Sequence, residues 1–156
     1  MAEKAVPMTK DGMKKVRAEL DHLINVRRHE VADRIHESKD SNSQNNAEYE
    51  DAKNEQAFVE GRIMTLERLL QNASLIDEDA AHHASQVQVG AKVTATGEDG
   101  RKFEYTIVGA AEAEPIKGLI SNESPVGMAL LGKRVGDEVL ISVPKGVLRL
   151  TIAGIS

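Results

Sequence analysis

The stretch at residues 47–74, AEYEDAKNEQAFVEGRIMTLERLLQNAS, decides the fold of the chain. Its seam residues recur in alternating steps of three and four over more than three heptads, which is typical of a coiled coil. These residues are Tyr49, Ala52, Gln56, Val59, Ile63, Leu66, Leu70 and Ala73. The pattern predicts one long amphipathic helix that needs a partner for its apolar face.

A second series with the same spacing precedes this stretch and predicts that partner. It begins after Thr9, a residue type suited to cap the N-terminus of a helix, with Met8 before it as a staple residue. Its seam contains Met13, Val16, Leu20, Leu23, Arg27 and Glu30, widened by Ile24, Val31 and Ile35. Polar residues that bond to their own backbone fill residues 38–46 between the two series. The sequence therefore predicts an antiparallel coiled-coil domain over residues 1–75, with its tip at about 38–46.

The texture of the sequence changes after this region. Residues 76–85 are polar and are predicted to form a linker, and residues 86–156 are rich in glycine and in alternating β-branched residues. Strands are predicted at 86–89, 92–96, 102–108, 119–121, 138–143 and 147–152. Ser124 as N-cap, Pro125 at the first helical position and Gly132 as the stop predict one short helix. The fold class is thus α+β, with a coiled coil followed by a small β-sheet domain.

Composition excludes several classes of function. The 156 residues carry a formal net charge of −5, which argues against a dedicated duplex-binding domain. Cysteine is absent, which excludes disulfides and thiolate zinc sites. The four aromatic residues are too few for a base-stacking platform. No apolar run of about 18 residues exists, so we expect no membrane partner and a cytoplasmic location.

Three separated motifs, in one collinear order from about residue 8 to about residue 152, carry a resemblance. They are Met8-Thr9-Lys10-Asp11-Gly12 at the start, Asn46-Ala47-Glu48-Tyr49 with the helix up to Ile63, and the segment Ile120–Val139. Together they closely resemble the bacterial Gre transcript-cleavage factors.

The resemblance implies an architecture, a partner and a mechanism. The C-terminal domain is expected to have the fold of FK506-binding proteins and to dock on bacterial RNA polymerase, at the rim of its secondary channel. The coiled coil is expected to enter that channel as a monomeric accessory factor. In the family, two acidic tip residues help hold a second Mg²⁺ and orient a water, and the polymerase hydrolyses the 3′ end of backtracked RNA. The chain itself is expected to bind no cofactor stably, to have no metal site of its own and to be no enzyme.

The expected tip departs from the family pattern. Aligned on Asn46-Ala47-Glu48-Tyr49, Asn42 stands at the position of the family's metal-holding Asp, and Asn45 at that of its Glu. An amide oxygen can coordinate Mg²⁺ but brings no negative charge. We therefore expect binding to the polymerase with weak or lost cleavage. Asp40 is a candidate substitute, although capping of a helix end also accounts for it.

Two further groups of residues follow from the resemblance. The polymerase-binding residues are expected to be Ser121, Ser124, Pro125, Gly127, Lys133 and Asp137. The basic residues expected close to the RNA 3′ end are Arg27, Arg34, Lys39 and Lys53. A solvated charged face is the alternative for the basic residues, and the start of a short helix is an alternative or additional reason for Ser124 and Pro125.

Other functions remain open at this point. The same architecture suits a channel-occupying inhibitor or modulator of polymerase. The implied C-terminal fold also suits a peptidyl-prolyl isomerase or chaperone, although such enzymes use an aromatic-lined pocket and this domain has only Phe103 and Tyr105. A coiled-coil scaffold without a role at polymerase is the remaining alternative, against which the C-terminal motifs argue.

Overall fold

The computed structural model describes residues 4–39 and 47–156. The chain divides into two compact units: the helical unit at Met13–Asn72, and the sheet unit, made of the described part of Met1–Gly12 together with Ala73–Ser156. The sequence predicts a coiled-coil domain over residues 1–75. The structure differs at both ends of that range, because the described residues up to Gly12 and residues 73–75 belong to the sheet unit.

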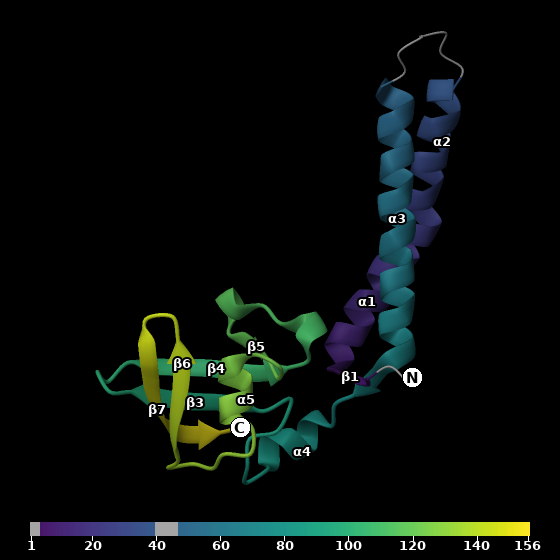
Figure 1. Ribbon diagram of the computed structural model, residues 1–156. Helices are drawn as coiled ribbons and strands as arrows, with labels where there is room; N and C mark the ends of the chain where they lie inside the picture. The colour runs from purple at the N-terminus through teal and green to yellow at the C-terminus, as the bar shows by residue number, and fades with distance from the viewer. Residues whose placement is uncertain (1–3, 40–46) are drawn as a thin grey trace. The chain divides into compact units, whose positions relative to one another are not determined.

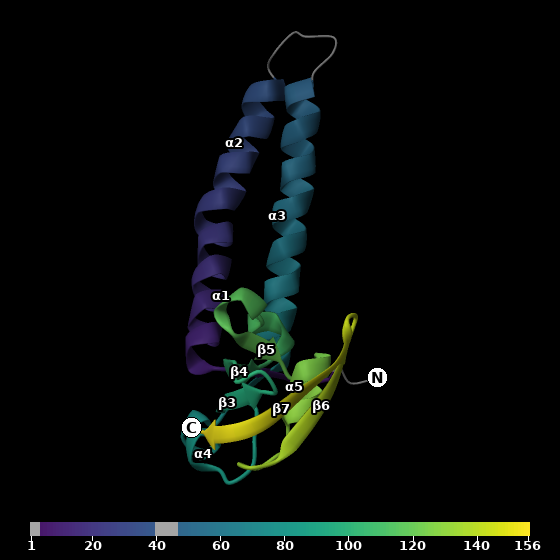
Figure 2. The same cartoon turned by 90° about the vertical axis from the view of Figure 1, so that its left-hand side faces the viewer.

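Antiparallel helices form the helical unit (Figures 1 and 2). One arm consists of α1 (Lys10–His22), a π-helical segment η1 (Leu23–Arg27) and α2 (Arg28–Lys39). The other arm is α3 (Ala47–Asn72), which runs beside α2 in both views. This confirms the predicted helical hairpin, except that α3 ends at Asn72 and Ala73 belongs to a strand.

Five buried apolar residues form one cluster in the seam between these helices. Leu23 and Val31 on one arm are buried with Val59, Ile63 and Leu66 on the other. These positions agree with the predicted spacing on α3, where the steps between buried residues are three and four. Burial of such side chains contributes about 1.5–3 kcal/mol each, so the seam is the main source of stability in the helical unit.

The predicted seam is wrong at Glu30, whose side chain is 52% exposed, whereas its neighbour Val31 is 1% exposed. The π-helical segment η1 explains the difference. A π turn contains more residues than an α turn, so the buried face comes back one residue later after Arg27. The spacing from Arg27 onward therefore becomes four and four, through Val31 to Ile35, instead of three.

Two three-residue strands that sequence reasoning did not anticipate belong to the sheet unit. β1 (Val6–Met8) and β2 (Ala73–Leu75) pair in parallel, with Met8 opposite Leu75. The Ile76 amide also donates to the Met8 carbonyl at 2.8 Å. The chain segments that enter α1 and leave α3 are therefore bonded to each other.

The predicted linker at 76–85 contains a helix, α4 (Glu78–His83). Asp77 caps it, since its carboxylate accepts from the Ala80 amide at 3.0 Å, and Ala81 is fully buried in the sheet core. The polar residues that suggested a linker lie on the exposed face of α4. The strand predicted at 86–89 is also wrong: this segment is a loop, fixed by the Val87 amide, which donates to the Lys133 carbonyl at 2.8 Å.

The remaining strands form one curled sheet in the order β5-β4-β3-β7-β6 (Figure 1). All neighbours are antiparallel except β4 and β5, which are parallel. The elements are β3 (Lys92–Gly97), β4 (Lys102–Val108), β5 (Leu119–Ser121), α5 (Pro125–Leu130), β6 (Glu138–Val143) and β7 (Gly146–Ile155), with short 3-10 turns η2 (Ala110–Glu112) and η3 (Pro115–Lys117). Inward-facing residues such as Val93, Ile141 and Ile152 pack with Leu130 of α5 in one core. The predicted α+β class is confirmed.

Within the sheet unit, Glu112 contacts Thr9 and Gly12, the residues at which α1 begins. The Thr9 hydroxyl accepts from the Gly12 amide at 3.0 Å, which confirms Thr9 as the N-cap. The Glu112 carboxylate accepts from the Thr9 amide at 2.7 Å and from the Thr9 hydroxyl. A Cβ on Gly12 would overlap the Glu112 side chain, so glycine allows this close approach.

We predict that Thr9→Val lowers the free energy of unfolding of the chain by about 1–2 kcal/mol, because it removes both the cap and a partner of Glu112. Thermal and denaturant unfolding followed by circular dichroism measure the loss. Thr65→Val is the matched control, since the exposed Thr65 hydroxyl only donates to the Gly61 carbonyl one turn earlier at 3.0 Å. Equal stability of the two variants would show that the Thr9 contacts contribute nothing.

Candidate functional site

The residues predicted for the tip, Asp40, Asn42 and Asn45, lie outside the described residues. The structure describes the two helix ends that lead to them. α2 ends at Lys39 and α3 begins at Ala47, with Glu48 and Glu50 in its first turn. A negative charge in the first turn interacts favourably with the positive end of the helix dipole and stabilises the helix, so Glu48 has a structural reason for its position.

A hollow of about 330 Å³ lies at this end of the helix pair and is lined by Arg34, Glu37, Ser38 and Glu48. Ser38 is buried, and its hydroxyl donates to the Arg34 carbonyl at 2.6 Å. Two carboxylates and one guanidinium therefore share the hollow, so the residues that line it carry a formal net charge of −1.

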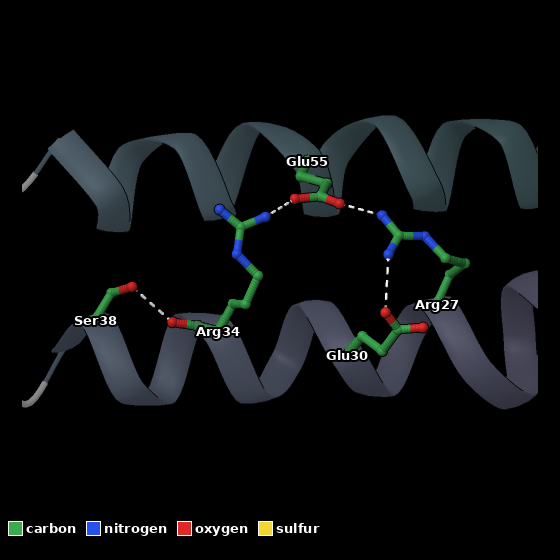
Figure 3. A network of polar contacts seen from close by, with 5 residues as sticks. All are labelled: Arg27, Glu30, Arg34, Ser38 and Glu55. Atoms are coloured by element: carbon green, nitrogen blue, oxygen red, sulfur yellow. Dashed lines mark hydrogen bonds and ion pairs between the residues drawn. The ribbon is translucent and has the colours of Figure 1, made fainter.

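A network of ion pairs connects the arms next to this hollow (Figure 3). Glu55 of α3 points between two guanidiniums of the other arm, and each of its oxygens accepts from one of them: Oε1 from Arg27 and Oε2 from Arg34. Arg27 also donates to Glu30 at 3.1 Å. Sequence reasoning missed Glu55, because residues 21 and 28 positions away supply its partners.

The structure brings together two of the four predicted RNA-proximal basic residues, Arg27 and Arg34, but pairs both with the same acid. Lys53 lies near Gln56, with its ammonium 3.3 Å from the amide oxygen, and Lys39 is exposed at the end of α2. The segments 26–39 and 47–60 contain five Lys and Arg against eight Asp and Glu. This part of the arm is therefore acidic on balance, and its arginines face carboxylates.

Two further pairs cross between the arms. Arg28 binds Glu60 through two nitrogens at 2.9 Å each, and Arg62 binds Glu19 at 2.8 and 3.0 Å. The hydrogen bond from Arg62 lowers the pKa of the Glu19 carboxyl below its usual value. These pairs fix the register of the arms, although partly exposed ion pairs contribute only modestly to stability.

The second group of predicted residues gathers at the start of α5 in the sheet unit. Ser124 is the N-cap: its hydroxyl accepts from the Gly127 amide at 3.1 Å and donates to the Ser121 carbonyl at 2.7 Å. The Ser121 hydroxyl in turn accepts from the Glu123 amide at 3.0 Å. Pro125 takes the first helical position as predicted. These contacts hold the loop 121–124 in one shape.

Gly127 is required by the same loop. A Cβ at this position would overlap the Ser121 carbonyl oxygen and lie 2.9 Å from the Ser121 carbonyl carbon. The two backbone segments approach so closely that no other residue fits without displacing the loop.

Lys133 and Asp137 lie in the turns that follow α5. The Asp137 carboxylate accepts from the Arg134 amide at 2.8 Å, and the Asp137 carbonyl accepts from the Ile152 amide at 2.9 Å. Lys133 is exposed, and its carbonyl accepts from Val87. The six predicted residues thus lie at the end of β5, at the start of α5 and in the turns that follow it.

Sequence reasoning did not single out two apolar side chains in the same region. Met128 on α5 is 62% exposed and Val135 in the following turn is 57% exposed. Apolar side chains that remain in water are candidates for a protein interface. The sequence signal for Met128 was its place in the same short helix as Leu130: because Leu130 is buried in the core, a residue two positions away on the helix faces a different side.

No three or more His, Cys, Asp or Glu side chains come together as a metal site within residues 4–39 and 47–156. In those same two segments, no helix has the length and apolar character needed to cross a lipid bilayer.

A helical hairpin followed by a curled sheet, with a rigid loop at the start of α5, defines a class of two-unit α+β proteins. Family profiles match both units: "Transcription elongation factor, N-terminal" matches residues 6–75, and "Transcription elongation factor, GreA/GreB, C-term" matches residues 82–156. The chain belongs to the GreA/GreB family of transcription elongation factors.

Relatives of known name agree with this assignment over nearly the whole chain. The chain is 48% identical to transcription elongation factor GreA of Thermoanaerobacter pseudethanolicus, covering 96% of each chain. It is 47% identical to the same factor of Bacillus licheniformis, covering 99% of this chain and 98% of that one. Among solved structures, GreA factor homolog 1 of Thermus thermophilus is 29% identical with a TM-score of 0.46, covering 98% of this chain and 99% of that one.

We predict that Gly127→Ala disrupts the loop 121–124 and destabilises the sheet unit by about 1–3 kcal/mol, since overpacking forces backbone shifts of this cost. Gly61→Ala is the matched control, because a Cβ there meets nothing within 4 Å and alanine favours the middle of a helix. Denaturant unfolding and the amide exchange rates of Gly127 and Glu123 measure the effect. The prediction is wrong if both variants are as stable as the natural chain.

Proposed function

We propose that this chain is a transcription elongation factor that binds bacterial core RNA polymerase and acts on paused or backtracked complexes. The observation that carries the proposal is the match of both units, in collinear order, to a family of transcription elongation factors. The sheet unit docks at the rim of the secondary channel through the loop around Ser121, Ser124 and Pro125, together with Gly127, Lys133 and Asp137. The helical unit enters the channel with the α2–α3 end first.

The proposal makes the chain an accessory factor that works as a monomer in the cytoplasm. The polymerase's own catalytic centre hydrolyses the RNA, and the factor contributes groups that position a water and a second Mg²⁺. Mg²⁺ is then shared with the polymerase, and only while cleavage occurs. The rigid backbone of the loop at the start of α5 supports docking, because a preformed surface loses less entropy on binding.

Cleavage stimulation is weak in this proposal because of Asn42 and Asn45. Both residues carry neutral amides where an acid would supply charge next to the metal. The interaction of each missing charge with a divalent cation is worth several kcal/mol by Coulomb estimate at an effective dielectric constant of about 20. Amides also cannot take a proton from the attacking water.

The basic residues on the arm have a secondary role in this proposal. Arg27, Arg34, Lys39 and Lys53 contact the 3′ segment of the nascent RNA, which follows the same channel. Their contribution is limited, because Arg27 and Arg34 are already paired with Glu55 and the surrounding segments are acidic on balance.

A second candidate function is a channel-occupying inhibitor or modulator of polymerase. The same two amides favour it, because an arm that enters the channel without activating a water would block access and do little else. For a peptidyl-prolyl isomerase or chaperone no such observation exists: Phe103 and Tyr105 stack on each other, with ring centroids 5.9 Å apart, and pack against the core.

We predict that the double change Asn42→Asp and Asn45→Glu raises the Mg²⁺-dependent cleavage rate of a stalled, backtracked complex by one to several powers of ten. Each 1.36 kcal/mol gained in the transition state is tenfold in rate. Asn54→Asp is the matched control: Asn54 is exposed on α3, so the change adds a negative charge to the arm away from the tip. Its rate should equal that of the natural chain.

Competition with an authentic cleavage factor serves as the binding control. An excess of the natural chain should slow cleavage by that factor, because both occupy the same channel. If the excess has no effect, the proposed binding mode is wrong. If competition occurs but the double variant cleaves no faster at any Mg²⁺ concentration, the role assigned to Asn42 and Asn45 is wrong.

A further inference from the structure

The single carboxylate of Glu55 forms ion pairs with two guanidiniums, those of Arg27 and Arg34. Its side chain is 26% exposed, against 33% for Arg27 and 49% for Arg34, so the acid is the least accessible member of the network. It reaches across from α3, whereas both arginines come from the opposite arm (Figure 3). Glu30, on the arginines' own arm, supplies the second carboxylate, and the four residues together are neutral.

This neutrality bears on anion binding. A guanidinium recognises a phosphate through the same planar N–H groups that it uses for a carboxylate. An RNA phosphate that approaches Arg27 or Arg34 must therefore displace a Glu55 oxygen, and it must do so on an arm whose surrounding segments already repel anions.

We propose that Glu55 is a specificity-determining residue that limits how strongly Arg27 and Arg34 bind the phosphates of a single-stranded RNA segment. The inference rests on the proposed function, in which such a segment lies beside the arm. Glu55 sets the preference of the factor for complexes with extruded RNA over complexes without it.

Fold stability alone is a weak reason for this arrangement. Partly exposed ion pairs contribute little to folding, and the apolar seam holds the same two helices together. Replacing Glu55 should therefore leave the hairpin folded. The same replacement changes the local charge from neutral to +1 and frees two guanidiniums.

The test uses Glu55→Gln in the full chain. Its apparent affinity is measured for two halted polymerase complexes, one backtracked with an extruded RNA 3′ segment and one without extruded RNA. The variant should raise the preference for the backtracked complex about two- to fivefold, the size expected for one partly exposed ion pair. Since the new contact is electrostatic, the gain should shrink as salt is raised.

Glu19→Gln is the matched control. It also removes one negative charge and frees an arginine, Arg62, from a two-nitrogen pair. Glu19 lies on α1, and its partner lies ten residues before the end of α3 at Asn72, away from the hollow beside Arg34. Its preference between the two complexes should stay within twofold of the natural chain.

A second set of variants assigns the gain to the named arginines. Adding Arg27→Gln and Arg34→Gln to the Glu55→Gln chain should abolish it. The same two changes in the natural chain should not raise the preference, because they leave Glu30 and Glu55 without these partners and make the network negative. The variant that carries only Arg27→Gln and Arg34→Gln keeps Glu55, so its result can be interpreted even if circular dichroism shows that Glu55→Gln weakens the fold.

The outcomes separate the inference from the proposed function. Binding of every variant to both complexes, with an unchanged preference for Glu55→Gln, would overturn the role of Glu55 and leave the proposed function intact. An equal gain for Glu19→Gln would also overturn it, since general charge would then explain the effect. No binding of the natural chain to either complex would overturn the proposed function and the inference with it.

Discussion

The apolar seam between the two arms is the contact on which the rest of the helical unit depends. Leu23 and Val31 pack against Val59, Ile63 and Leu66, and this packing determines which residues of the arms face each other. One helical turn is about 5.4 Å, so a slip by one turn would separate Glu55 from Arg27 and Arg34. The polar network and the position of the helix ends beside the tip both follow from this register.

Much of the fold can be predicted from the sequence because its signals are local. The cap at Thr9, the heptad spacing of α3, the Ser124–Pro125 helix start and five of the six predicted strands depend on neighbouring residues only. The π-helical segment could not be predicted, because no residue between Leu23 and Arg27 requires it. Helix α4 was hidden by its polar composition, since a single buried alanine, Ala81, attaches it to the core.

The candidate site could be predicted only in part, for a different physical reason. Ser124 and Gly127 are explained by contacts within seven residues, which sequence motifs capture. The charge state around Arg27 and Arg34 depends on Glu55, which the chain brings close only by folding back on itself. The four basic residues were selected from both arms by residue type, so the pairing of Arg27 and Arg34 with Glu55 was not part of the prediction. The assignment of Asn42 and Asn45 to the positions of two acids rests on the sequence resemblance alone and stays a prediction, since both residues lie outside the described part of the chain.

Delivery of the arm to the polymerase catalytic centre is the central claim, and a tethered cleavage reagent tests it most directly. The chain has no cysteine, so Lys39→Cys creates a single thiol at the end of α2 for an iron chelate that generates hydroxyl radicals. With core polymerase bound, the chelate should cut the polymerase chains around the catalytic centre and the 3′ segment of the RNA. The same chelate at Lys145→Cys, in the turn between β6 and β7, should cut neither. Equal cutting patterns from the two positions, or none near the catalytic centre from position 39, would contradict the account.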